Sequence, residues 1–576
     1  MKKIHPQRFR ATVVLALFFI WIAAIGVRTG YLQIYKGEWL SKKAAGQYEQ
    51  ELVLKGKRGT IYDRRHEAMA VSIETTSIAA YPGMIENKPK AASELARILN
   101  HKRATIVKAL GSGRSFVWLK RQATPTQVKA VRQLKIKGID FLPEHSRFYP
   151  GTTLAAQVLG FSGIDGRGLE GLEYYYEEQL KGTENKVTIL KDALGRGFDV
   201  DHWSALNQAG NNIILTIDRQ VQYFAEKALA KTVTAHQAQS GIALVMVPNT
   251  GALLAVAHYP FFNPNAYNKS DHTTWRNRAI TDSFEPGSTM KIFSVAAALE
   301  SGKSTPSSIF YCENGNYLVG DHTVHDSKPY GWLSVQQIIK YSSNIGAIKM
   351  IEEVGPKSLY DQLKKFGFGD PTGIDCPGEQ SGSLSNYKYW TAVDTGTIAF
   401  GQGISSSALR LITSAAAVAN DGVLMRPYVV EAITSPEGKI LKKTDPKPIR
   451  RVISAQTAQT VRRIMRSVVT EGGTGEKAEV DGYTVCGKTG TAQKIDSKGN
   501  YAKNSYVASF LGFAPTDRPA IAVLVIVDEP KDIYYGGLVA APAFSQIVKE
   551  TLGYLNVAPT PDWKKLRVSR EVKTKG

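Results

Sequence analysis

The chain contains little cysteine and few of the motifs that would assign it to a common class. Its 576 residues include three cysteines, Cys312, Cys376 and Cys486, which lie far apart and form no CxxC pair. This spacing excludes a disulfide framework and a cysteine zinc site. No nucleic-acid-binding module or GxxxxGK[ST] phosphate loop occurs, so the net charge of +21 does not indicate a nucleic-acid partner. We expect instead an anionic lipid or an anionic polymer.

Long apolar runs are scarce as well, since residues 11–27 form the one uncharged run of this kind. Its length of roughly 17 residues is the short end of a membrane-spanning helix, and we predict an anchor over residues 11–31. The first ten residues carry four basic side chains and no acid, which favours a cytoplasmic N-terminus and an exported remainder. A cleaved signal peptide is the alternative, but the run exceeds the usual apolar core of about 7–15 residues. Export excludes kinases and NTPases, because ATP is not available outside the cytoplasm.

Hydrophobic patterns divide the remainder into two regions. Between residues 32 and 215, amphipathic helices at 88–100 and 124–135 alternate with short strand-like runs. Between 216 and 557 we expect a strand and a helix, a β-hairpin around PNTG, and two strands around PTDRP before a last helix. Strands at both ends with helices between them favour an antiparallel sheet packed against helices, an α+β fold. The basic stretch 558–576 is expected to be a tail.

Ser288 and Lys291 form an SxxK pattern within EPGSTMKIFSVAAALESG. The residues that follow are almost all apolar or small, which is typical of a buried helix. A spacing of three places both side chains on one helix face, and burial lowers the pKa of a lysine, so a neutral amine could take the hydroxyl proton. The pattern favours acyl transfer, but alone it leaves an ordinary helix start open. A second SxxK, Ser385 to Lys388, occurs in SLSNYK.

Two further motifs follow in order. YSSN contains an SxN at residues 342–344, and CGKTGTAQK contains KTGT at residues 488–491, on an expected strand. Each could be structural alone, since SSN is a common loop and KTGT could be a surface strand. The order SxxK, SxN and KTG within one domain-sized span is the signature of penicillin-binding proteins and serine β-lactamases.

The sequence resembles class B penicillin-binding proteins over nearly its whole length, and among them the FtsI-like division transpeptidases. RGTIYDRRHEAMA is similar to the family's pedestal motif RGxIxDRxGxxLA, with His66 in place of a glycine. The resemblance implies a single N-terminal transmembrane helix, an extended mixed α/β pedestal, and a transpeptidase domain like that of serine β-lactamases. The implied boundaries are a cytoplasmic tail at 1–10, the anchor at 11–31, the pedestal at 32–215, the transpeptidase domain at 216–557 and the tail at 558–576.

The resemblance also implies catalytic roles. Ser288 would attack the penultimate D-Ala carbonyl of a stem pentapeptide, with Lys291 as general base, and D-Ala would leave an acyl-enzyme behind. Ser342 would relay a proton to the leaving amine, with Lys488 tuning it electrostatically. Asn344 would hold the substrate amide and help to fix Lys291.

Substrate contacts are implied for the KTGT strand. Thr489 and Thr491 lie on one side of a strand by its period of two and would bind the terminal carboxylate. Gly490 would let the substrate backbone lie against the strand edge. The backbone N–H groups of Ser288 and Thr491 would form the oxyanion hole. The resemblance implies no metal and no cofactor.

The implied partners are the stem pentapeptide of nascent glycan made from lipid II, an FtsW-like glycosyltransferase, other divisome membrane proteins, and β-lactams as covalent inhibitors. The implied location is the bacterial inner membrane at the division septum, in a single pass with a periplasmic catalytic domain. Three alternatives stay open: a hydrolytic β-lactamase, a penicillin-recognising sensor, and a non-catalytic divisome scaffold. A β-lactamase is disfavoured because no ExxLN segment lies between Ser342 and Lys488. The acceptor amine, from diaminopimelate or lysine, is not readable from the sequence.

Overall fold

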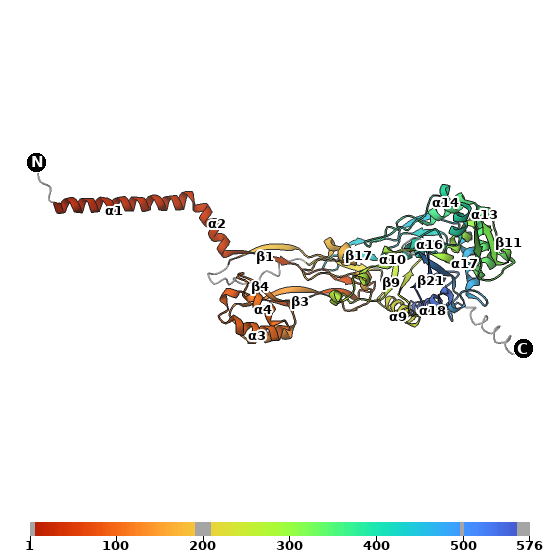
Figure 1. The fold of residues 1–576 in the computed structure, drawn as a ribbon, viewed down its shortest axis with the longest axis horizontal. Helices are drawn as coiled ribbons and strands as arrows, with labels where there is room; N and C mark the ends of the chain where they lie inside the picture. Colours follow the sequence, from red (N-terminus) through yellow and green to blue (C-terminus); the bar gives the residue numbers. More distant parts are fainter. Residues whose placement is uncertain (1–5, 191–208, 496–499, 561–576) are drawn as a thin grey trace. The chain divides into compact units, whose positions relative to one another are not determined.

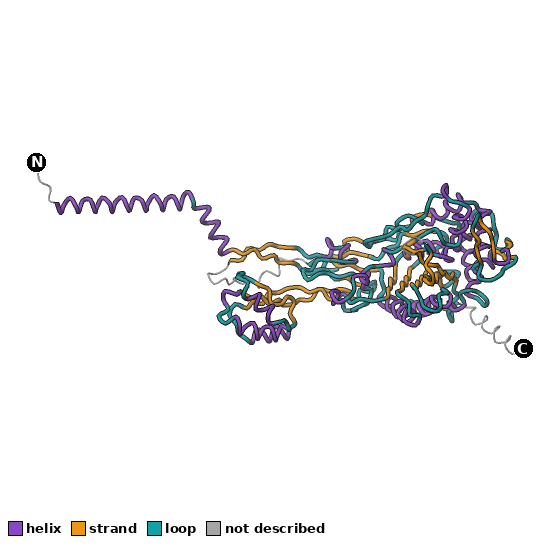
Figure 2. The backbone as a smooth tube through the Cα atoms, viewed as in Figure 1, coloured by secondary structure: helices purple, strands orange, loops and turns teal. Residues whose placement is uncertain are grey.

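The computed structural model describes residues 6–190, 209–495 and 500–560. It divides into two compact units, Met1–Lys57 with Gly182–Ala209 and Arg58–Lys181 with Gly210–Gly576. Figure 1 labels the elements and Figure 2 distinguishes helices from strands. Most of the predicted tail, residues 561–576, and the first five residues of the chain lie outside the described residues.

The first unit contains the apolar N-terminal helix. Helix α1 (Pro6–Gly30) continues into a π-helical turn, η1 (Tyr31–Tyr35), and is followed by α2 (Gly37–Tyr48). Strand β1 (Glu49–Lys55) then pairs antiparallel with β6 (Glu184–Leu190), over seven residues of each strand.

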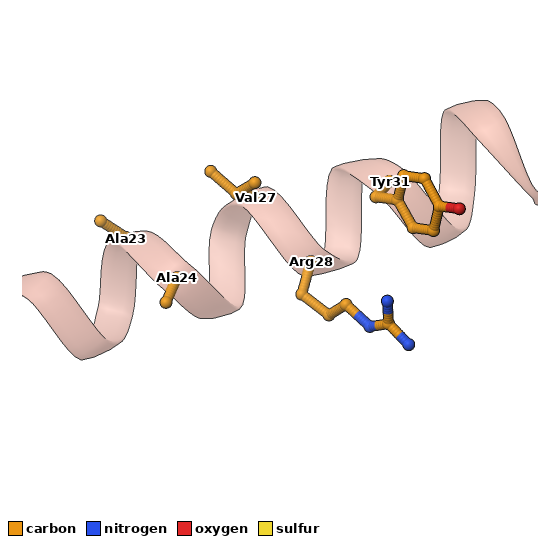
Figure 3. A pocket seen from close by; sticks show the side chains of 5 residues that line it. All are labelled: Ala23, Ala24, Val27, Arg28 and Tyr31. Carbon is orange, nitrogen blue, oxygen red and sulfur yellow. The ribbon is translucent and has the colours of Figure 1, made fainter.

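Within the described residues, Gln7–Tyr35 is the one helical span long and apolar enough to cross a membrane. It extends the predicted 11–31 at both ends, because the flanking residues continue the helical hydrogen bonding beyond the apolar run. This helix is a candidate membrane anchor. A recess of about 500 Å³ lies on its surface. Figure 3 shows the side chains that line it, which are Ala23, Ala24, Val27, Arg28 and Tyr31.

The second unit contains a seven-stranded sheet that joins distant parts of the sequence. Its order is β18-β17-β7-β2-β3-β4, with β5 also paired to β3. The strands are β2 (Ile61–Tyr62), β3 (Ala68–Ala80), β4 (Val117–Ala123), β5 (Ile139–Phe148), β7 (Asn212–Leu215), β17 (Val430–Thr434) and β18 (Ile440–Lys443). Strand β7 pairs antiparallel with β17 and parallel with β2. The ladder therefore crosses the boundary predicted at residue 215, and the domain boundaries stay a prediction.

Helices α3 (Lys88–Leu99) and α5 (Pro125–Gln133) confirm the two amphipathic helices expected in this region. Asn87 caps α3, since its side chain accepts a hydrogen bond from Lys90 N–H at 3.0 Å. Thr124 and Gln127 form a capping box at the start of α5. Both helices bury one apolar face in a small core beneath β3 and β4.

His66 keeps the turn that the family motif builds with glycine. Its backbone lies in the left-handed region, with φ at 64°. Asp63 Oδ1 accepts hydrogen bonds from the N–H groups of Arg65 and Glu67, both at 2.8 Å, and His66 N–H donates to Asp63 O at 3.0 Å. These bonds offset the cost of about 1–2 kcal/mol that a side chain incurs in this conformation.

A buried ionic cluster lies beside α7 (Gly171–Tyr175). Glu173 has no exposed surface and accepts hydrogen bonds from Arg58 Nε and Arg147 Nε, both at 2.6 Å. Arg58 also pairs with Glu177 at 2.6 Å. Burial by itself would raise the pKa of Glu173, but Arg147 and Arg58 outweigh it and lower the pKa below its usual value. The carboxylate is therefore charged, and it balances two buried guanidinium groups.

A second sheet in this unit has five strands, and all of its pairings are antiparallel. Its order is β20-β21-β22-β8-β9, and the strands span Cys486–Ile495, Tyr501–Ala514, Ile521–Asp528, Ser240–Met246 and Leu253–Tyr259 respectively. The hairpin predicted around PNTG and the strand pair predicted around PTDRP are both confirmed. In β22, Val523 and Val525 enter one core cluster while Leu524 and Ile526 enter another. The strand is apolar throughout because both faces of the sheet are covered.

Helices cover the two faces of this sheet (Figure 1). Helices α9 (Arg219–Ala235) and α18 (Gly536–Tyr554) contribute to the cluster on one face. Helices α11 (Lys291–Glu300), α16 (Ala408–Ala419) and α17 (Ala455–Val469) contribute to the cluster on the other. This arrangement confirms the α+β class. The remaining α-helices are α4 (Arg103–Leu110), α6 (Ala156–Leu159), α8 (Glu177–Leu180), α10 (Arg278–Thr281), α12 (Val335–Tyr341), α13 (Asn344–Val354), α14 (Pro356–Phe366) and α15 (Ala392–Ala399).

Four two-stranded ladders lie against the helices of this unit. They are β10 (Ser283–Phe284) with β15 (Ser406–Ser407), β11 (Ile309–Tyr311) with β14 (Trp332–Ser334), β12 (Asn316–Val319) with β13 (His322–His325), and β16 (Val423–Met425) with β19 (Pro448–Arg451).

The ionic cluster generates a stability prediction. We expect Glu173→Gln to lower the free energy of unfolding by about 3–5 kcal/mol, because it leaves the buried Arg147 without its counter-charge and Arg58 with only the part-exposed Glu177. Differential scanning fluorimetry of the detergent-purified chain would measure the fall in melting temperature. The control is Glu178→Gln, whose side chain is 74% exposed and pairs only at the surface with Lys181, and it should cost below about 1 kcal/mol. Equal melting temperatures for the two variants would contradict the prediction.

Candidate active site

Three segments bring the motif residues together. Ser288 lies in a 3₁₀ turn, η6 (Gly287–Met290), that leads into α11. Ser342 lies between α12 and α13, and Lys488 lies on β20. Ser288 is half-buried, whereas Lys291 and Lys488 have no exposed surface. The second SxxK does not join this group, because Ser385 and Lys388 are exposed and Ser385 Oγ accepts a hydrogen bond from Trp390 Nε1.

The amine of Lys291 is the centre of the group. Its Nζ lies 3.0 Å from Ser288 Oγ, 2.8 Å from Ser342 O and 2.7 Å from Asn344 Oδ1. The last two atoms are carbonyl oxygens, which can only accept. A neutral amine has two N–H groups, so it donates both to these oxygens and turns its lone pair to Ser288.

Burial sets the protonation state of this amine. Desolvation lowers the pKa of Lys291 from its ordinary value to about 7, although the charge of Asp326 opposes the shift. A lysine with this pKa is part neutral at neutral pH and can accept a proton. The helix that supplies it explains the burial, since Ile292, Phe293 and Val295, which follow Lys291, are fully buried.

A second buried amine lies on the opposite side of Ser342. Lys488 Nζ donates to Ser342 Oγ at 2.8 Å and lies 3.2 Å from Thr489 Oγ1. Desolvation, and then the neighbouring Lys291, lower the pKa of Lys488 well below its ordinary value. The Ser342 hydroxyl therefore lies between two amines, because Lys291 Nζ is also 3.3 Å from Ser342 Oγ. Such an arrangement can pass a proton.

Ser342 occupies a strained backbone position that its neighbours hold. Its φ is 62°, in the left-handed region where it ends α12. Ser343 then caps α13, with Oγ accepting from Gly346 N–H at 2.9 Å. Conformations of this kind persist where surrounding contacts over-determine them. Here the two lysines bind both the carbonyl and the hydroxyl of Ser342.

Asp326 is a site residue that the sequence motifs do not reveal. Its carboxylate accepts hydrogen bonds from Ser343 Oγ and from the N–H groups of Asn344 and Ile345, at the N-terminus of α13. The next residue back, His325, accepts from Asn344 Nδ2 through its carbonyl at 3.1 Å. Asn344 is thereby fixed at its main chain and its amide. No local spacing signals this contact, since Asp326 reaches α13 from the far end of the β12–β13 hairpin.

Strand β20 is the edge of its sheet and lies against the turn that carries Ser288. A Cβ at Gly490 would lie 2.2 Å from Ser509 Oγ and 3.2 Å from Pro286 O, so the absent side chain is what lets the strand approach. Thr491 Oγ1 accepts from Gly536 N–H at 3.2 Å, at the start of α18. Cys486 has no exposed surface, which confirms it as a small buried residue of the strand.

The chain matches two family models. Residues 241–549 match the penicillin binding protein transpeptidase domain, and residues 53–215 match the penicillin-binding protein dimerisation domain.

Individual proteins are similar over nearly the full chain. The probable peptidoglycan D,D-transpeptidase PenA of Neisseria meningitidis is 35% identical over 568 residues, which are 97% of this chain and 95% of PenA. The peptidoglycan D,D-transpeptidase FtsI of Escherichia coli is 32% identical over 556 residues, 95% of this chain and 91% of FtsI. The crystal structure of penicillin binding protein 3 from Mycobacterium tuberculosis, complexed with aztreonam, is 29% identical with a TM-score of 0.70, and covers 88% of this chain and 98% of that chain.

The Asp326 contacts generate a prediction about local stability. We expect Asp326→Ala to weaken the first turn of α13 by about 1–2 kcal/mol, because three donors lose a charged acceptor at a helix N-terminus. Hydrogen–deuterium exchange of peptides from α13 should be about five- to thirtyfold faster, with peptides from α14 unchanged. Asp321→Ala, in the same hairpin but 87% exposed, is the control. Exchange in α13 that matches the control would contradict this role.

Proposed function

The chain belongs to the penicillin-binding protein transpeptidase family, and we propose that it cross-links peptidoglycan through an acyl-enzyme on Ser288. It is a peptidoglycan D,D-transpeptidase that releases D-Ala from one stem peptide and joins the remainder to another. The similarity to FtsI over 95% of the chain supports septal wall synthesis over a sensor or a scaffold. The observation that carries the proposal is the contact of 3.0 Å between the buried Lys291 amine and Ser288 Oγ.

Acylation begins with proton transfer. Ser288 Oγ attacks the penultimate D-Ala carbonyl carbon while its proton passes to the lone pair of Lys291 Nζ. Lys291 is prepared for this step by burial, which lowers its pKa to about 7. The carbonyl oxygens of Ser342 and Asn344 hold the amine in the orientation that points the lone pair at Ser288.

The tetrahedral intermediate then collapses. Its negative oxygen is stabilised by the backbone N–H groups of Ser288 and Thr491. The peptide bond to the terminal D-Ala breaks, and the leaving amine takes a proton from Ser342 Oγ, which is resupplied by the lysines on either side. D-Ala departs and an ester to Ser288 remains.

The terminal carboxylate of the donor peptide is bound in the middle of β20, at Thr489 and Thr491. Thr489 and Thr491 offer hydroxyl groups, and the N-terminus of α18 next to Thr491 contributes partial positive charge. An arriving carboxylate would favour the charged form of Lys488, whose pKa is low in the free enzyme. Binding of the correct anion thus changes the proton distribution around Ser342.

Transfer completes the cycle. The amine of a second stem peptide attacks the ester carbon, the bond to Ser288 Oγ breaks, and the amine proton returns to the serine through Lys291. A β-lactam follows the first half of this path, because its strained amide is attacked in the same way. Its ring nitrogen stays attached to the acyl group, so it blocks the amine that would complete the transfer.

The setting of the enzyme is proposed from the anchor and from the relatives. The candidate membrane helix Gln7–Tyr35 supports a single-pass protein of the inner membrane. We place its N-terminus in the cytoplasm, because basic residues precede the apolar run, and its catalytic unit in the periplasm at the septum. The partners are an FtsW-like glycosyltransferase, which supplies nascent glycan made from lipid II, and other divisome membrane proteins.

The nucleophile is tested by labelling. Fluorescent penicillin should label the purified full-length chain, and the label should persist for hours because the sequence has no ExxLN segment between Ser342 and Lys488 to supply a water-activating glutamate. Ser288→Ala should abolish labelling, whereas Ser385→Ala, in the second SxxK, should leave it unchanged. Fluorescence after denaturing electrophoresis measures both. Rapid loss of the label would indicate a hydrolase, and labelling of Ser288→Ala would refute the assignment.

The protonation of Lys291 predicts the pH dependence of acylation. The neutral amine is the reactive form, so the rate should rise with pH through about 7, from roughly a tenth of its maximum at pH 6 to roughly nine tenths at pH 8. Lys291→Arg should abolish this rise with pH and should lower the acylation rate by about 10²–10⁴-fold, because the guanidinium stays protonated. The acylation rate is measured at each pH from 5.5 to 9 by the amount of fluorescent label incorporated at a series of quenched time points. A rate that falls as pH rises through 7 would contradict Lys291 as the base.

A further inference from the structure

Glu285 lies three residues before the nucleophile and outside the motifs that identify the site. Its carboxylate accepts the N–H of Gly403 at 2.8 Å and the hydroxyl of Tyr501 at 3.2 Å. Burial raises the pKa of Glu285, and these two donated bonds lower it in return. Both bonds therefore favour the charged carboxylate, which holds two donors at once.

The first of these donors belongs to a loop that touches the nucleophile turn directly. Gly401 O accepts a hydrogen bond from Gly287 N–H at 3.0 Å. A Cβ on Gly401, whose φ is 91°, would lie 2.1 Å from Gly287 O. The loop thus lies against the turn by its backbone, and Glu285 adds a second attachment at Gly403.

The second donor belongs to the β20–β21 hairpin. Tyr501 is the first residue of β21 and is paired in register with Ile495 of β20. Thr491 lies four residues back along β20. The bond from Tyr501 to Glu285 joins residues 216 positions apart and ties the outer part of the hairpin to the turn that carries Ser288.

This connection matters because the two N–H donors of the oxyanion hole belong to different elements. One N–H donor, Ser288, belongs to η6, and the other, Thr491, belongs to β20. Neither element alone sets the distance between the two donors, and catalytic geometry must be held within about 0.5 Å. Contacts that fix the hairpin against the turn therefore fix the oxyanion hole.

We propose that Glu285 is a positioning residue, whose carboxylate clamps the β20–β21 hairpin and the loop at Gly403 to the nucleophile turn and so sets the separation of the Ser288 and Thr491 N–H groups. This inference rests on the proposed function and names a residue that acts through the oxyanion donors without contacting substrate.

The chain supplies a matched control on the same hairpin. Lys494 lies on β20 and pairs with Glu529 at 2.7 Å and Asp528 at 3.0 Å. Removing this lysine loosens the hairpin from β22 and the loop that follows it, without touching the nucleophile turn. Lys494→Met therefore separates a general weakening of the hairpin from loss of the clamp.

The experiment measures acylation and turnover in the full-length chain. Wild type, Glu285→Ala, Glu285→Gln, Tyr501→Phe and Lys494→Met are compared by the rate constant of fluorescent-penicillin acylation, and by kcat and KM on a D-Ala thioester analogue. Loss of a single oxyanion donor costs about 10²–10³-fold in kcat, and we expect misplacement in Glu285→Ala to cost about tenfold. KM should change little, because the carboxylate-binding threonines are intact. Glu285→Gln should retain part of the rate, since its amide oxygen can still accept from Gly403.

A double variant, Glu285→Ala with Tyr501→Phe, completes the set. A tenfold loss in Glu285→Ala, a smaller loss in Tyr501→Phe, and a double variant no slower than Glu285→Ala support a shared bond. An equal loss in Lys494→Met, or a rate loss matched by a fall in melting temperature, would overturn the clamp. Wild-type rates in Glu285→Ala would also overturn it while leaving the transpeptidase assignment standing, because wild type would still label at Ser288. Absence of labelling in wild type would instead refute the proposed function.

Discussion

The arrangement of the site depends on the exclusion of water from the amine of Lys291. Lys291 is held at the start of a helix that is buried from Lys291 to Ala298, and water is replaced around its Nζ by Ser288, Ser342 and Asn344. Desolvation disfavours the charged form, and that single energetic cost converts a common surface cation into a base. The apolar residues of α11 and the core cluster that they join keep this amine buried, and burial is the main cause of its lowered pKa.

The second lysine, Lys488, makes the protonation of the site sensitive to nearby charges. Two amines that share the Ser342 hydroxyl cannot both be charged at little cost, so the proton distribution between Lys291 and Lys488 follows the charge of whatever lies nearby. Asp326 biases it from one side, and a substrate carboxylate would bias it from the other. In the proposed mechanism, acylation is therefore coupled to binding of the substrate carboxylate, and ligands that lack this anion are disfavoured.

Much of the fold and most of the site residues could be predicted from the sequence. The other contacts could not, for physical reasons. The buried helix after Ser288 and the apolar strands 240–246 and 521–528 follow from periodicity and from two covered faces. The motif order identified the residues that meet. Asp326 and Glu285 were missed because their partners lie 18 and 216 positions away, and a side-chain contact of that range leaves no local pattern. The pairing of β7 with β17 was missed for the same reason.

That pairing has a mechanical consequence. Strands β2 and β3, near the start of the second unit, continue through β7 into β17 and β18 by backbone hydrogen bonds. A ladder loaded along its strands resists in shear, because all of its bonds must break together. Tension applied to β3 is therefore carried through β2 and β7 to β17 and β18, which belong to the same unit as the active site.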